Sequence, residues 1–156
     1  MEIDFGWLSG SDLAVYLRNA RWGYAAVNAT HILGIALLVG AIVPLDLKLL
    51  GFWPRVPREH LLQVLVPVAV AGLVIAVGAG LLLFSVRPAD YWGLAVFRIK
   101  IAVIALGILS ALALHVQYGR NLEDAPAARL GSAAAISMSC WLGALVLGRL
   151  IAFAAD

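Results

Sequence analysis

Charge, cysteine and methionine are all scarce in this chain of 156 residues. Charged residues make up 13% of the chain, roughly half of the ~25% typical of soluble domains. The single cysteine, Cys140, excludes an internal disulfide. No stripe of Lys and Arg with interleaved aromatic residues is present, so we expect no nucleic-acid partner. The sequence also lacks a phosphate-cradling glycine loop and a Cys/His cluster with zinc spacing.

Four long apolar runs account for most of the sequence, and 63% of the residues are hydrophobic. A helix needs about 20 apolar residues to cross the hydrocarbon core of a membrane. By uncharged length, the runs predict spans at about 24–45, 62–84, 92–116 and 132–154. Their short connectors make sequential helices antiparallel neighbours. The sequence therefore predicts an all-α fold, in which residues 1–156 form a single integral membrane four-helix bundle with antiparallel up-down topology.

The segment before the first span predicts a short helix at the membrane surface. Ser11 is a favourable N-cap, and Leu13, Tyr16 and Leu17 recur at helical spacing. We therefore expect a short N-terminal interfacial helix over 11–21.

Orientation follows from the distribution of Lys and Arg. One side of the predicted bundle carries Lys48, Arg55, Arg58, Arg120 and Arg129, and the other carries Arg18, Arg21 and Arg87. By the positive-inside rule, we expect a multi-pass protein of the bacterial inner (plasma) membrane with both termini outside.

Three of the four predicted spans contain ionisable residues that a lipid-facing helix avoids: His31, Lys100 and Arg149. Such residues usually mark a functional site. At a rise of about 1.5 Å per residue, all three lie about 8 to 12 Å below the outer face. The second span reaches this level with Gly78 and Gly80, which are small enough to admit a flat ligand. We therefore expect a cationic pocket in the outer leaflet.

Helical rotation adds two residues to this predicted pocket, because Tyr24, Asn28 and His31 share one stripe of the first span. Arg98 lies about 200° around the helix from Lys100, and we expect its side chain to reach the headgroups. Packing is an alternative role for each pocket residue, since an intramembrane His often only bonds a neighbouring helix. The shared level, without an acidic partner, favours a bound ligand.

A second polar group lies near the other membrane face and consists of Asp46, Lys48, His60, His115 and Tyr118. Asp46 follows the first predicted span and His115 ends the third, so a contact between them is geometrically feasible. A solvated network of salt bridges is the expected arrangement. His115 is separated from His31 by most of the bilayer, so the two cannot ligate one haem.

Several segments together resemble an uncharacterised bacterial family of small four-span inner-membrane proteins, and this likeness covers nearly all of the chain. The segments are His31 to Gly40, Pro44 to Gly51, Gly80 to Phe84, Phe97 to Lys100 and Gly148 to Phe153. The chain is more distantly similar to small membrane protoporphyrinogen oxidases and to CopD-type copper-resistance membrane domains. The oxidases have a first-span His and a third-span Lys, matching His31 and Lys100. This resemblance implies porphyrin binding.

The residues and the resemblance favour a protein that binds haem b or a porphyrin-like ligand and that, if it is an enzyme, is an oxidoreductase. His31 is the candidate metal ligand, Lys100 and Arg149 are candidate propionate partners, and Gly78 and Gly80 admit the ring.

Two alternatives stay open. The first alternative is a transport or accessory subunit that binds an anionic metabolite or lipid. The second is a structural membrane anchor subunit. Besides the lipid bilayer, the expected partners are a second copy of the chain or another membrane subunit.

Overall fold

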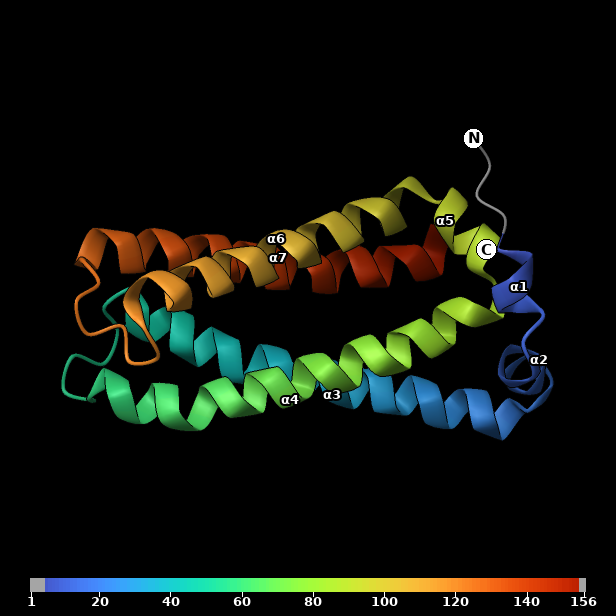
Figure 1. Cartoon of the computed structure of the whole chain (residues 1–156), viewed down its shortest axis with the longest axis horizontal. Coiled ribbons are helices and arrows are strands. Elements are labelled where there is room, and N and C mark those ends of the chain that lie inside the picture. Colours follow the sequence, from blue (N-terminus) through green and yellow to red (C-terminus); the bar gives the residue numbers. More distant parts are fainter. Residues whose placement is uncertain (1–4, 155–156) are drawn as a thin grey trace.

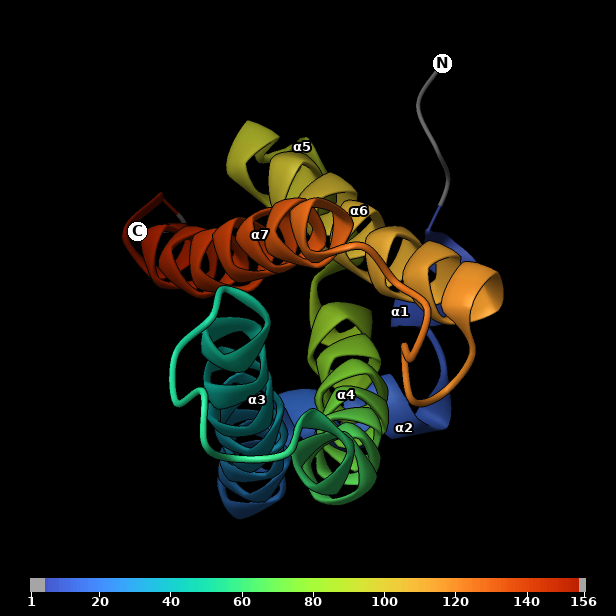
Figure 2. The same cartoon turned by 90° about the vertical axis from the view of Figure 1, so that its left-hand side faces the viewer.

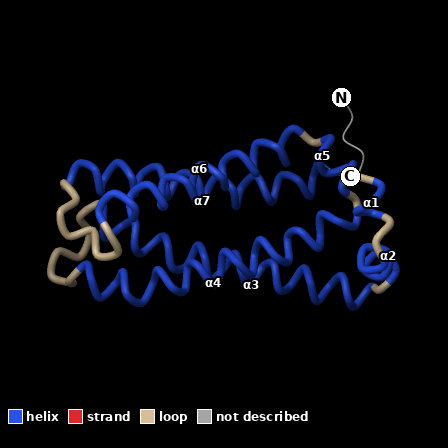
Figure 3. Tube along the Cα trace, in the orientation of Figure 1, coloured by secondary structure: helices blue, strands red, loops and turns tan. Residues whose placement is uncertain are grey.

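The computed structural model describes residues 5–154, which form seven helices and no strand (Figure 3). In chain order the helices are α1 (Gly6–Ser9), α2 (Asp12–Asn19), α3 (Arg21–Leu49), α4 (Arg58–Val86), α5 (Pro88–Gly93), α6 (Ala95–Tyr118) and α7 (Ala127–Ala154). The predicted all-α fold is confirmed. The short helices α1 and α5 have no counterpart among the predicted elements.

Four of these helices, α3, α4, α6 and α7, are long and apolar enough to cross a membrane. They run alternately up and down (Figure 1), and the chain is a multi-pass membrane protein. Two of them, α3 and α4, extend beyond the predicted spans at both ends, and α7 begins five residues before its predicted start, because uncharged length marks only the apolar part of a helix. The extension matters most in α3, which continues past Asp46 and Lys48 to Leu49.

The third span starts later than predicted, at Ala95. Trp92 belongs to the separate helix α5, and Leu94 interrupts the helical backbone with a ψ of 121°. Aromatic packing stabilises this corner, since the rings of Phe84 and Phe97 stack with their centroids 5.3 Å apart.

The backbones of α3 and α4 lie in direct contact at two glycines. A Cβ atom placed on Gly34 would lie 2.5 Å from the backbone nitrogen of Ala76. One on Gly72 would lie 2.5 Å from the backbone nitrogen of Leu38. Both positions therefore require glycine, which lets the two backbones approach where any side chain would separate them.

The α6–α7 pair is joined to α3–α4 mainly through contacts between α3 and α7, and Figure 2 shows α7 beside the end of α3. Gly107 of α6 faces Trp141 and Cys140 of α7, with 3.2 Å between a Cβ placed on Gly107 and the Cβ of Cys140. Over the described residues, α4 and α6 do not pack closely against each other. The α3–α4 hairpin and the α6–α7 hairpin therefore pack against each other mainly along α3 and α7.

The predicted interfacial helix is observed as α2, which lies across the ends of the spans (Figures 1 and 2). The Ser11 hydroxyl accepts a hydrogen bond from the backbone N–H of Ala14, at 3.3 Å. The Arg18 guanidinium anchors the helix, since it donates to the carbonyls of Val86 at 2.9 Å and Ser9 at 3.1 Å. The first bond also satisfies an end carbonyl of α4.

Candidate functional site

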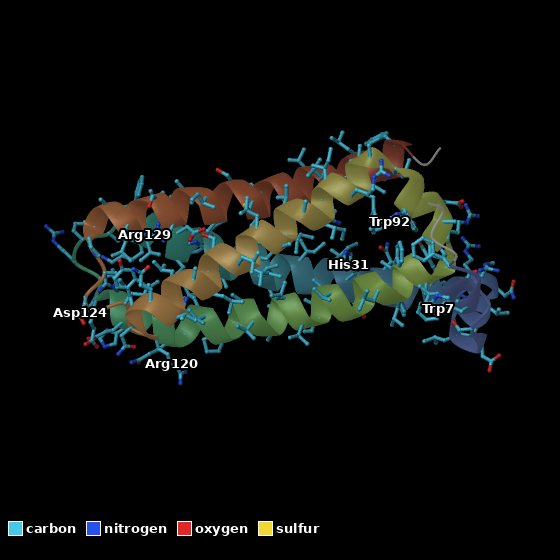
Figure 4. The ribbon with its side chains drawn as sticks, turned by 45° about the horizontal axis from the view of Figure 1, so that its top comes forward. Trp7, His31, Trp92, Arg120, Asp124 and Arg129 are labelled. Atoms are coloured by element: carbon cyan, nitrogen blue, oxygen red, sulfur yellow. The ribbon has the colours of Figure 1, made fainter. Side chains whose placement is uncertain are left out.

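His31 lies half-buried on α3 and contacts α4. Its Nδ1 is 2.7 Å from the carbonyl oxygen of Ala76. A carbonyl only accepts, so Nδ1 carries the proton and, in the neutral ring, Nε2 keeps a free lone pair. A Cβ on Gly80 would lie 3.1 Å from the imidazole Cε1. Gly80 therefore makes room for the imidazole ring itself. Figure 4 shows His31 in the same half of the bundle as Trp92 and Trp7.

Lys100 approaches this level from the other hairpin. It is half-buried on α6, and a Cβ on Gly148 of α7 would lie 3.0 Å from its Nζ. Lys100 also interacts electrostatically with His31. The structure thus brings together His31, Gly80 and Lys100, whereas Asn28, less than one turn before His31, is exposed.

The remaining residues of the predicted pocket lie elsewhere. Arg149 is exposed, and its guanidinium carbon lies 4.9 Å from the centroid of the Phe153 ring, one turn further along α7. Gly78 is exposed, and a Cβ placed there would meet no neighbouring atom within 4 Å. Tyr24 forms a side-chain hydrogen bond with Tyr91 of α5. The predicted seven-residue pocket therefore reduces to a smaller cluster around His31.

A cavity of about 370 Å³ lies in the opposite half of the bundle, between α3, α4, α6 and α7. This volume lies within the usual range of ligand pockets. The connector between α6 and α7 covers one end with Leu122, which is fully buried and whose carbonyl accepts a hydrogen bond from Arg58 at 2.7 Å. The lining is mostly apolar, and its polar side chains are Asp46, Ser110, His115, Ser137 and Trp141.

Three of these lining side chains have a buried polar atom without a hydrogen-bond partner: Asp46 at Oδ2, His115 at Nε2 and Trp141 at Nε1. They come from α3, α6 and α7. Ser137 offers the Asp46 carboxyl group a hydrogen bond, and His115 Nδ1 lies 2.9 Å from the carbonyl oxygen of Ala111. A buried polar atom without a partner costs about 1–3 kcal/mol, so the cavity offers three polar atoms that a bound molecule or an ordered water can satisfy.

The expected solvated network at this end is not what the structure shows. Asp46 is only 4% exposed, because α3 carries it onto the same face as the buried residues Leu38 and Leu45. The burial of Asp46 could have been predicted from the sequence, because Leu38, Ile42 and Asp46 recur at a spacing of four residues on one helix. The position of Trp141 and Ser137 at the cavity could not be predicted in this way, because they lie in a span that is apolar on all sides.

Among residues 5–154, no group of three or more His, Cys, Asp and Glu side chains is placed to hold a metal ion. Comparison of the chain with protein-family models, with curated proteins and with solved structures found no significant match.

Proposed function

We propose that this protein binds a mostly apolar molecule of the quinol type, an aromatic ring with hydroxyl groups, in the cavity between α3, α4, α6 and α7. The observation that carries this proposal is the set of three unpartnered polar atoms on Asp46, His115 and Trp141, in side chains that line an otherwise apolar cavity. The apolar lining favours the body of the ligand and the three polar atoms favour its substituents.

The three atoms differ in their hydrogen-bonding chemistry. His115 donates from Nδ1 to a carbonyl, so Nε2 is an acceptor in the neutral ring. Asp46 Oδ2 also accepts when the carboxyl group is ionised, and the indole Nε1 of Trp141 only donates. A ligand with two hydroxyl groups matches two acceptors and one donor better than a ligand with carbonyl groups alone.

The cavity is accessible from the lipid phase. Val70 of α4 and Leu112 of α6 line it and are each 55% exposed. They lie on the two helices that do not pack closely over the described residues. A lipid-soluble ring can therefore enter between α4 and α6 without crossing water.

A direct test is binding of a short-chain ubiquinone analogue, in its reduced and oxidised forms, to the purified protein in detergent. We expect the reduced form to raise the unfolding temperature more than the oxidised form, since only the former donates hydrogen bonds. Ala111→Phe, which fills the cavity, should abolish the shift. Ala113→Phe is the matched control, because Ala113 is exposed and does not line the cavity. Absence of a shift, or equal shifts in both variants, contradicts the proposal.

A second candidate function, haem or porphyrin binding at His31, has its own supporting observation. The bond from Nδ1 to the Ala76 carbonyl leaves Nε2 free, which is the arrangement typical of a histidine ligand. The nearby Lys100 fits a propionate partner.

Visible spectra of the protein with added haem test this second candidate. We expect a Soret band that is lost in His31→Ala and retained in His115→Ala, since His115 lies in the other half of the bundle. A colourless protein that takes up no haem would eliminate it.

The distribution of Lys and Arg supports one further proposal, that both termini lie outside the bacterial inner membrane. Alkaline phosphatase fused to the C-terminus should then be active, and green fluorescent protein at the same position should be dark. The reverse pattern would place the termini in the cytoplasm.

A further inference from the structure

A second hollow, of about 510 Å³, lies at the end of the bundle where α2 crosses α3 and α4. Unlike the cavity inside the membrane, it is lined by three arginines, Arg18, Arg21 and Arg87. Tyr24 and Tyr91 form part of the same wall. These residues belong to three helices and the α4–α5 junction, so the fold gathers them from distant parts of the sequence.

The side chains that line this hollow carry net positive charge, and the acidic Asp90 of α5 acts on Tyr91 but does not line the hollow. No acidic residue within 5–154 lines it, and neither Arg21 nor Arg87 has an ion-paired partner in that part of the chain. Like charges repel unless a counter-charge joins them. Arg21 and Arg87 are both exposed, and each is free to present its planar donor fork to an anion.

Two other features hold the hollow in shape. Arg18 is fixed by its bonds to the carbonyls of Ser9 and Val86. Tyr91 hydrogen-bonds with Tyr24, and burial, followed by the neighbouring Tyr24, raises the pKa of its phenol group. A tyrosine is protonated at neutral pH even at its ordinary pKa of about 10, so Tyr91 is a neutral side chain that does not repel an anion.

We propose that this hollow binds a phosphate group, and that the headgroup of an anionic phospholipid supplies it. Arg forks match phosphate oxygens in geometry and charge. The hollow lies at the ends of the spans, since Arg21 is the first residue of α3 and Arg87 directly follows α4. This is the level at which a bilayer presents its headgroups, and basic pockets beside spans bind such lipids.

The experiment uses the full chain in nanodiscs of phosphatidylcholine, to which phosphatidylglycerol or inorganic phosphate is added, with thermal unfolding as the readout. The test variant is the double substitution Arg21→Gln/Arg87→Gln, which leaves the anchoring Arg18 intact. The matched control is Arg55→Gln/Arg120→Gln, which removes two exposed arginines from the other end of the bundle.

Phosphatidylglycerol should stabilise the unaltered protein and the control, and its apparent affinity should fall by about tenfold or more in the test variant. Stabilisation by inorganic phosphate that is lost in the test variant would support the phosphate site but assign it to a soluble ligand. Equal effects in both double variants, or no stabilisation by either probe, would overturn the proposal.

Discussion

Gly34→Ala is expected to destabilise the bundle by roughly 1–3 kcal/mol or more, the cost of forcing an extra methyl group into a packed interface. The added Cβ would lie 2.5 Å from the backbone nitrogen of Ala76, and backbone cannot rotate away as a side chain can. The helices α3 and α4 must therefore separate, which weakens the most extensive helix contact of the molecule. Gly72→Ala should have the same effect, because its Cβ would meet the backbone of Leu38.

Each of these variants has a control on its own helix. Gly40 of α3 and Gly78 of α4 are exposed, and a Cβ at either position would meet nothing within 4 Å. Gly40→Ala and Gly78→Ala should be neutral or stabilise by up to about 1 kcal/mol, because alanine favours the helix. Reversible unfolding in mixed micelles measures the four free energies. If the Gly34→Ala and Gly40→Ala variants have the same free energy of unfolding, then α3 and α4 do not approach each other as closely at Gly34 as the structure shows.

Asp46→Leu is expected to act in the opposite direction and stabilise the protein by about 1–3 kcal/mol. The reason is that Asp46 is buried with one carboxyl oxygen unpartnered, and an apolar side chain removes that cost from an apolar cavity. The same substitution should abolish the stabilisation by the reduced ubiquinone analogue, since it removes an acceptor. A gain in stability at the expense of binding is typical of functional sites.

The control for this variant is Glu59→Leu, which removes an exposed carboxylate from the first turn of α4. A loss of no more than about 1 kcal/mol is expected there, from the lost interaction with the helix dipole. If Asp46→Leu instead destabilises the protein by about 3–5 kcal/mol, the carboxylate has a charged partner in solution. The cavity would then be a structural ion-pair site.

The common level of His31 and Lys100 could be derived from the sequence because depth depends only on helical rise. The structure places Lys100 near enough to His31 to act on it electrostatically. Arg149 and Gly78 share the level but not the cluster, since rotation about the helix axis also decides what a residue meets. For Gly78 and Arg149 no sequence signal sets that rotation, because α4 and α7 are apolar on nearly every side.

The four spans, their alternating order and the interfacial helix were determined by the sequence alone. The length of an apolar run and the chemistry of an N-cap are local properties of the sequence. Within a bilayer, a long apolar run must also form a helix, because its backbone groups have no water to bond. Only the tertiary structure decided which polar residues are buried together at the cavity. Asp46 became buried because α3 continues past its apolar run, and Trp141 joined it because α7 packs on α3. Contacts between spans depend on close packing at residues such as Gly34, and such packing has no hydrophobic pattern that a sequence can display.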